Sequence, residues 1–475
     1  MEQGPPQSGK WRQVATAWLP FADAASADLP LGQLLRLALF QFSVGMAMVL
    51  LNGTLNRVMI VELGIPAWLV ALMIAVPLMI APFRAALGHR SDTHRSVLGW
   101  RRVPYIWFGS LMQFGGLAIM PFALLLMSRP DAFNLGVAAS VLAFLLAGAG
   151  MHTTQTAGLA LATDLAPAEK RPRAVALLYV MLLVGMMFAA LVIGGLLRDF
   201  TPTRLVQVIQ GSAVLTIILN MIALWKQEPR NRALTDTSEA RIPFAQVWKG
   251  FTARPNTVRL LAAIGLGTMG FAMQDALLEP FGGEILHLSV GATTGLTGAW
   301  ALGALLGFTF SASHLTRGTD PLRLSGTGVV IGISAFLMVL FADPLNAPGL
   351  LGAGAVAIGL GVGLFSVGTL VAAMELAPDD SAGLALGAWG AVQATAMGVA
   401  IALGGIIRDL VGNFATAEGF GAALADRATG YTVVYTLEII LLLGTLVVLG
   451  PLVGRTRAGG TKNAAARFGL QEFPT

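Results

Sequence analysis

Long apolar runs alternate with short polar segments along almost the entire chain. A helix needs about 20 mainly apolar residues to cross the hydrocarbon core of a bilayer, so each run predicts a membrane-spanning helix. The pattern therefore predicts an all-α integral membrane protein with twelve transmembrane helices, six on each side of a polar segment. The runs are 34–56, 66–87, 103–127, 134–158, 174–197, 203–225, 259–278, 289–313, 322–342, 346–372, 382–407 and 431–453.

Polar segments separate the two groups of helices and flank them at both ends. The first 30 residues lack the apolar stretch of a cleavable signal peptide. We expect them to form either a short amphipathic segment at the membrane surface or a solvated tail. The predicted organisation is an N-terminal tail at 1–33, a six-helix half at 34–225, a linker at 226–258, a second half at 259–453 and a C-terminal tail at 454–475.

The two halves contain matching sequence motifs. "ATDLAPAEKRPRA" begins at Ala162 and "AMELAPDDSAGLA" at Ala373. Further along, "GGLLRDF" at 194–200 matches "GGIIRDL" at 404–410. Each pair brackets the fifth predicted helix of its half. Two six-helix repeats in the same orientation, joined by a polar linker, indicate the major facilitator fold.

Composition and charge support this assignment and give it an orientation. The chain is 55% hydrophobic and 12% charged, against about 25% charged residues in a soluble domain. Most Lys and Arg residues lie in the tails, the linker and the loops on one side, which the positive-inside rule places in the cytoplasm. The basic residues form no stripe, so no nucleic-acid partner is expected. The absence of cysteine excludes disulfides and thiolate metal sites.

The second and third predicted helices are joined by a basic loop, "GHRSDTHRSVLGWRR" at 88–102. Its spacing fits the Gly-x-x-x-Asp turn of the major facilitator fold, with arginines behind the turn. We expect these arginines to face carboxylates of a neighbouring loop and to fix one arrangement of the helices. The alternative is a solvated loop that only enforces topology. The predicted loop cluster comprises Gly88, Asp92, Arg95, Arg101, Arg102, Asp164, Arg171 and Glu375.

Four long stretches resemble one family closely. They are "GTLNRVMIVELGIPAWLVALMIAVPLMIAPFRA" (53–85), "RSDTHRSVLGWRRVPYIWFGSLMQFGGLAIMPFALLLMS" (90–128), "LATDLAPAEKRPRAVALLYVMLLVGM" (161–186) and "AMELAPDDSAGLALGAWGAVQATA" (373–396). The sequence resembles the PucC/LhaA family, also called the bacteriochlorophyll delivery family, from about residue 31 to 454.

This resemblance implies a role in assembling the light-harvesting antenna of purple phototrophic bacteria, either the core antenna LH1 or the peripheral antenna LH2. It implies a multi-pass protein of the intracytoplasmic inner membrane that supplies or retains bacteriochlorophyll a while antenna polypeptides insert. The implied partners are the light-harvesting α and β polypeptides, with the reaction centre–LH1 complex and bacteriochlorophyll synthase as further candidates.

The sequence offers few polar side chains within the spans that are suited to a pigment. His152 is the only histidine in the middle of a confident span, and imidazole is a good axial ligand for the Mg²⁺ of a bacteriochlorophyll. Gln155, Asn52 and Asn56 complete the candidate pigment site. The alternative is that His152 only forms a hydrogen bond, with Thr153, Gln155 or one of the two asparagines.

Three acidic residues, Asp275, Glu279 and Glu438, lie within or at the end of predicted spans. A charge in lipid is costly and is retained for a purpose. They are predicted either to couple to protons or to pair with Arg57, Arg408 or a loop amide. The N-terminal half has almost no such residues, which disfavours a proton symporter of polar solutes.

Neither a catalytic constellation nor a metal-spaced cluster is found in the sequence, so we expect no enzyme. Small residues at four-residue spacing, Gly303 with Gly307 and Gly359 with Gly363, favour close helix packing. Two alternatives to pigment delivery remain. One is a facilitator-type transporter of a small solute or lipid, and the other is an assembly scaffold that binds no pigment.

Overall fold

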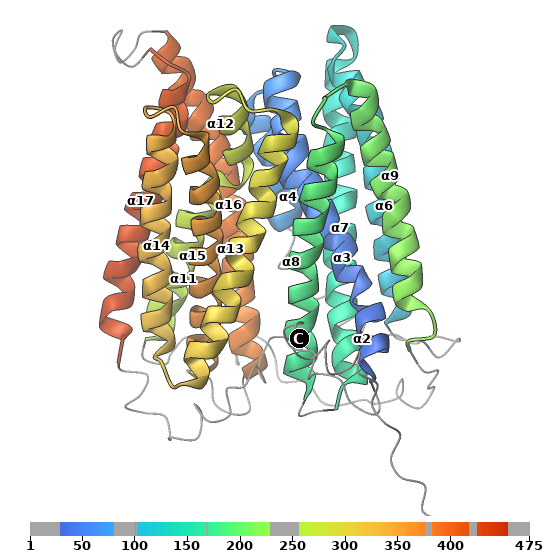
Figure 1. The fold of residues 1–475 in the computed structure, drawn as a ribbon, viewed down its shortest axis with the longest axis vertical. Coiled ribbons are helices and arrows are strands. Elements are labelled where there is room, and N and C mark those ends of the chain that lie inside the picture. The colour runs from blue at the N-terminus through green and yellow to red at the C-terminus, as the bar shows by residue number, and fades with distance from the viewer. Residues whose placement is uncertain are drawn as a thin grey trace, which may run out of the picture.

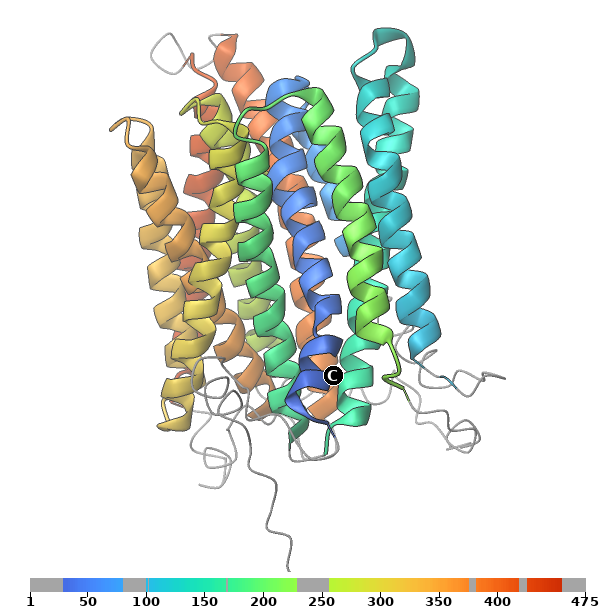
Figure 2. The ribbon, with the colours of Figure 1, turned by 45° about the vertical axis from the view of Figure 1, so that its right-hand side comes forward.

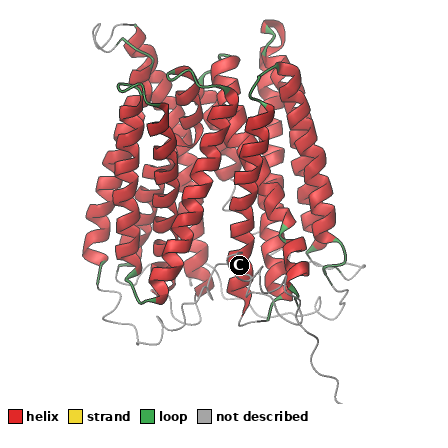
Figure 3. Ribbon diagram, viewed as in Figure 1, coloured by secondary structure: helices red, strands yellow, loops and turns green. Residues whose placement is uncertain are grey.

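The computed structural model describes residues 29–79, 100, 102–167, 170–228, 256–375, 382–417 and 425–454, with the backbone alone for Pro172 and for 382–387. These residues form a bundle of long helices that run side by side (Figures 1 and 3). Among them, eleven helices are long and apolar enough to cross a membrane, and Ala67–Met79 is a shorter apolar helix. The prediction of an all-α, twelve-helix membrane protein is confirmed.

The N-terminal half contains the first six membrane-spanning segments. The first is built from α2 (Leu31–Leu37), α3 (Leu39–Met48) and the π-helical segments η2 (Val49–Leu55) and η3 (Val58–Glu62). The others are α4 (Ala67–Met79), α6 (Val103–Met127), α7 (Phe133–Leu165), α8 (Arg171–Leu196) and α9 (Pro202–Leu224), with the short η5 (Pro130–Ala132) between α6 and α7.

The C-terminal half contains the remaining six. The seventh segment is α11 (Thr257–Ala272), the 3₁₀ turn η8 (Met273–Ala276) and α12 (Leu278–Glu284). The others are α13 (Val290–Thr316), α14 (Pro321–Ala342), α15 (Pro348–Glu375), α16 (Ala382–Thr416) and α17 (Ala428–Leu449), followed by η11 (Gly450–Leu452).

The two halves lie beside each other, and the first described helix, α2, begins at the same end of the bundle at which α17 ends (Figures 1 and 2). We call the end where α2 begins and α17 ends the terminal end, and the opposite end the distal end. The described parts of the predicted tails and linker, at 29–33, 226–228, 256–258 and 454, lie next to helix ends at the terminal end.

Two predicted helix limits are wrong, and one further span is interrupted. The first helix was expected to end before Arg57 but continues to Glu62, because Arg57 forms an ion pair with Glu62. α16 was expected to end at residue 407 but continues to Thr416, because Arg408 is paired inside the protein. The seventh helix was expected to be continuous, but it is broken at η8.

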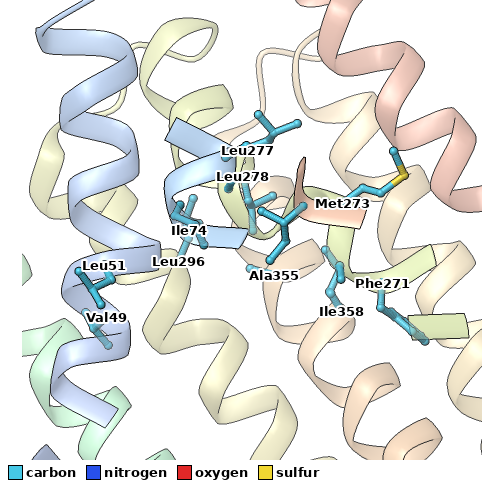
Figure 4. Packing of buried hydrophobic residues seen from close by; sticks show 14 of the residues in the cluster. Val49, Leu51, Ile74, Phe271, Met273, Leu277, Leu278, Leu296, Ala355 and Ile358 are labelled. Atoms are coloured by element: carbon cyan, nitrogen blue, oxygen red, sulfur yellow. The ribbon is translucent and has the colours of Figure 1, made fainter. Parts of the chain in front are cut away.

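A single buried apolar cluster extends across both halves. Figure 4 labels Ile74 of α4 together with Leu278 and Leu296 of the seventh and eighth spans, which belong to the same cluster. Within the C-terminal half, the predicted glycine spacing does bring helices together. A Cβ atom on Gly307 of α13 would lie 3.0 Å from the Cα of Gly363 of α15. Such contacts let helix backbones approach closely in a membrane.

Candidate functional site

At the terminal end, part of the predicted loop cluster joins α6, α7 and the end of α9. The guanidinium of Arg102 donates to Asp164 at 3.0 Å. Glu228 accepts hydrogen bonds from the backbone N–H groups of Arg102 and Val103, at 3.0 Å and 2.8 Å, and so caps the N-terminus of α6. Arg102 therefore faces a carboxylate of another helix end, as the sequence suggested.

The rest of this cluster is less closely connected. The Nε of Arg171 is 3.4 Å from the carbonyl oxygen of Ala166, and Glu375 is exposed at the end of α15. Gly88, Asp92, Arg95 and Arg101 lie outside the described residues.

Inside the N-terminal half, the structure brings Gln41 of α3 to Gln155 of α7, an approach the sequence analysis did not foresee. The Nε2 of Gln155 donates to the Oε1 of Gln41 at 3.4 Å. His152 lies one turn before Gln155 on the same helix, and both are half-buried. Gln41 is fully buried, and its own Nε2 has no hydrogen-bond partner among the described residues. We call Gln41, His152 and Gln155 the inner polar group.

The two asparagines of the candidate pigment site do not behave alike. Asn52 is half-buried in the π-helical segment η2. Asn56 is fully buried, and its Nδ2 donates to the Oε2 of Glu279 in the other half at 3.2 Å. Thr297 donates to the second oxygen of Glu279 at 2.7 Å. Asn56 therefore contributes to a contact between the halves, not to the inner polar group.

The three acidic residues lie around the break in the seventh helix. Glu438 of α17 is fully buried and accepts a hydrogen bond from the backbone N–H of Gln274 at 2.8 Å. The side chain of Gln274 in turn donates to Asp275. Glu279 follows in the first turn of α12. We call Asp275, Glu279 and Glu438 the acidic group.

The predicted pairing of these acids with Arg57 or Arg408 is wrong, because both arginines have other partners. Arg57 pairs with Glu62 and donates to the carbonyl oxygen of Leu288 at 3.1 Å. Of the three predicted kinds of partner, the described residues contain only a loop amide. It is the backbone N–H of Gln274, which donates to Glu438.

Arg408 is the centre of a second network at the distal end. It pairs with Glu284 and, at 2.7 Å, with Asp409. The hydroxyl of Tyr431 accepts from Arg408 at 3.1 Å and donates to Glu284 at 2.7 Å. The other oxygen of Asp409 accepts from the backbone N–H of Trp68 at 2.8 Å, across the two halves. The sequence analysis missed Asp409, although the repeated Arg-Asp motif marks its position.

Four hydrogen bonds of the described residues thus join the halves, and all four lie toward the distal end. They connect Thr54 with Thr294, Asn56 with Glu279, Arg57 with Leu288 and Trp68 with Asp409. We call these four contacts the distal closure. The inner polar group lies between them and the terminal end.

The sequence profile of the family described as "PUCC protein" matches residues 54–457. The chain belongs to the PucC family. It is 54% identical over 468 residues to a Rhodobacter capsulatus protein described by its location in the puhA-bchM intergenic region, covering 97% of this chain and 98% of that one. It is 55% identical to Protein PucC of Rhodovulum sulfidophilum, covering 84% and 89%.

A more distant relative has a name that mentions a pigment. The "Bacteriochlorophyll synthase 44.5 kDa chain" of Rhodobacter capsulatus is 30% identical over 405 residues, covering 82% of this chain and 91% of that one. Among solved structures, a bacterial homolog of the human lysosomal transporter Spinster superposes with a TM-score of 0.66 at 15% identity, covering 93% of this chain and 98% of that one. This PucC-family chain therefore has the fold of major facilitator transporters.

Proposed function

We propose that this protein is an assembly factor for the bacterial light-harvesting antenna, LH1 or LH2, which binds bacteriochlorophyll a and passes it to the antenna polypeptides. Membership of the PucC family carries this proposal, supported by a relative whose name includes bacteriochlorophyll. The proposed partners are the light-harvesting α and β polypeptides, then the reaction centre–LH1 complex and bacteriochlorophyll synthase. In this proposal the protein itself catalyses no reaction.

The inner polar group fits a bacteriochlorophyll in its chemistry. A bound bacteriochlorophyll supplies light absorption and a central Mg²⁺ that takes an axial ligand, for which the half-buried imidazole of His152 is suitable. The unpartnered amide N–H of Gln41 is suited to donate to a carbonyl oxygen at the edge of the macrocycle. A buried donor without a partner costs free energy, so a ligand acceptor here is favourable. Asn56 is excluded from this site by its bond to Glu279.

We further propose that the protein lies in the inner, intracytoplasmic membrane with its terminal end in the cytoplasm. Arginines gather at the terminal end: Arg171 and Arg173 in the first turn of α8, Arg317 directly after α13 and Arg323 in the first turn of α14. The positive-inside rule favours this orientation. Both chain ends are then cytoplasmic.

The experiment is an absorption spectrum of the protein purified in mild detergent from a bacteriochlorophyll-producing host. We expect a near-infrared band at about one pigment per chain, reduced several-fold by His152→Ala. His314→Ala is the matched control, because His314 lies in the last turn of α13 and contacts Phe310 of its own helix. A colourless wild-type protein that retains antenna polypeptides would support the pigment-free scaffold instead.

A transporter of a small solute or lipid is the second candidate function. The fold and the one-sided distal closure favour it. A colourless protein without antenna polypeptides, combined with uptake of a solute or lipid into vesicles that contain it, would replace the first proposal by this one.

A further inference from the structure

The acidic group is built around a break in a membrane-spanning helix. α11 ends at Ala272 and α12 begins at Leu278, with the 3₁₀ turn η8 between them. Asp275 lies in this turn. Gln274 lies in the same turn, and its backbone N–H donates a hydrogen bond to Glu438. Non-helical backbone at membrane depth is tolerated where it is buried in protein or lines an ion or substrate path.

No arginine or lysine of the described residues forms an ion pair with the acidic group. The charged groups on the neighbouring elements already have partners of opposite charge. Arg57 pairs with Glu62, and Glu284 pairs with Arg408 and Arg427, while Arg408 also holds Asp409. A buried carboxylate without a counter-charge takes up a proton in preference to remaining ionised.

Two buried atoms beside the break have no hydrogen-bond partner among the described residues. They are the Oε2 of Glu438 and the hydroxyl of Tyr435, and both residues are 0% exposed. The Tyr435 ring meets Phe281 of α12 edge-on at 5.5 Å, two residues from Glu279. Protonation makes the Glu438 carboxyl group neutral, so that this buried oxygen needs no counter-charge.

The acidic group is graded in exposure. Glu438 is fully buried and Glu279 is 5% exposed, whereas Asp275 is half-buried. Asp275 is therefore the most accessible member of the group. Glu279 connects the group to the distal closure through Asn56.

We propose that Asp275, Glu279 and Glu438 form a proton-exchange site whose occupancy is linked to the distal closure, whichever molecule the protein handles. When the halves are closed at the distal end, Glu279 is shielded from water, and this burial favours its protonated form more than the hydrogen bond from Asn56 favours the carboxylate. When they part there, Glu279 loses Asn56, gains water and releases the proton. The state that binds more protons is favoured at lower pH, so acidification favours the closed distal end.

The test measures the distance between the two halves at the distal end as a function of pH. The chain has no cysteine, so Asn134→Cys at the start of α7 and Thr416→Cys at the end of α16 provide two exposed positions for spin labels. In lipid nanodiscs we expect the population with the shorter distance to increase as the pH falls. Glu279→Gln should remain in the short-distance population at every pH, because its amide is always neutral.

Asp426→Asn is the matched control, because Asp426 is an exposed carboxylate at the same end. It should leave the pH response unchanged. Infrared spectra of the wild type should contain the carbonyl band of a buried protonated carboxyl group, which Glu438→Gln reduces. A distance that does not depend on pH, a response that persists in Glu279→Gln, or one that follows sodium at constant pH would each overturn the proposal.

Discussion

The same short motif, Gly-Gly-x-x-Arg-Asp, occurs in α8 with the loop after it and in α16, yet its two copies have different partners. In α16, Asp409 is only 8% exposed and is held between Arg408 and the backbone N–H of Trp68 in the other half. In the first copy, Arg198 and Asp199 are exposed. The repeat has placed the two motifs alike, but only one of them joins the halves through charge.

The start of the helix opposite each motif explains the difference. α4 begins after Pro66, which has no side-chain acceptor for the first N–H groups of the helix, so Asp409 supplies one. α13 begins after Ser289, whose own hydroxyl accepts from the N–H of Ala292 at 3.2 Å. Because Ser289 already accepts from an N–H group in the first turn of α13, that turn does not need a carboxylate of the other half as an acceptor.

Close backbone contact occurs at both interfaces, as at Gly405 of α16 against Ala67 of α4, but between α8 and α13 no charged contact accompanies it among the described residues. A Cβ atom on Gly194 would lie 2.9 Å from the carbonyl oxygen of Gly291, so neither position has room for a side chain. The contact between α4 and α16 should therefore be sensitive to loss of charge as well as to added volume, and the contact between α8 and α13 to added volume alone.

Arg408→Ala should have the largest effect. It leaves Asp409 buried without its guanidinium and Glu284 with only the exposed Arg427, and removing one partner of a buried ion pair costs about 3–5 kcal/mol. Arg198→Ala, the repeat-related and exposed substitution, should change the free energy of unfolding by no more than about 0.5 kcal/mol. Denaturant unfolding in detergent measures both. Equal effects would contradict the distinction between the two motifs.

Gly291→Val should come second. Its Cβ would lie 3.2 Å from the Cα of Arg198 and closer still to Gly194, and overpacking of this kind costs about 1–3 kcal/mol. Gly295→Val on the same helix is the control, because a Cβ there meets nothing within 4 Å. The same unfolding measurement applies. If Gly291→Val is no worse than Gly295→Val, the helices are not held at this distance.

The apolar runs predict the helices well. They do not predict that two helices continue past a charged residue. Bilayer thickness forces apolar runs of fixed length, which explains why twelve spans were recognisable. Arg57 and Arg408 were placed in loops, because a hydropathy pattern records the cost of a charge and not its partner. Glu62 is five residues from Arg57, whereas Glu284 is far from Arg408 in sequence and reaches it only through packing.

The candidate site was predictable to a smaller extent. His152 and Gln155 are half-buried, and Gln155 contacts the fully buried Gln41, as polar residues within a span seldom face lipid. Asn56 was assigned to the same group, yet it faces Glu279 of the other half. One turn of a helix decides which neighbour a side chain meets, and this choice depends on how the halves pack together.

Asp409→Ala should have the smallest effect of the three substitutions. Loss of a helix cap costs about 0.5–2 kcal/mol, and Arg408 keeps Glu284 as a partner. Asp409→Asn should recover most of this loss, because an amide oxygen still accepts from the N–H of Trp68. Ser289→Ala, measured in the same way, removes the corresponding cap of α13 from within its own half and should have a similar cost.

The two cap substitutions differ in what they do to the interface. Asp409→Ala should also part α4 from α16, which a spin-label pair on these helices detects, whereas Ser289→Ala should leave α8 and α13 in place. If Asp409→Asn is as damaging as Asp409→Ala, the charge paired with Arg408 is the more important contribution. The contact between α4 and α16 would then depend on the ion pair between Arg408 and Asp409. This pair would hold Asp409 in the position from which it accepts the hydrogen bond of Trp68.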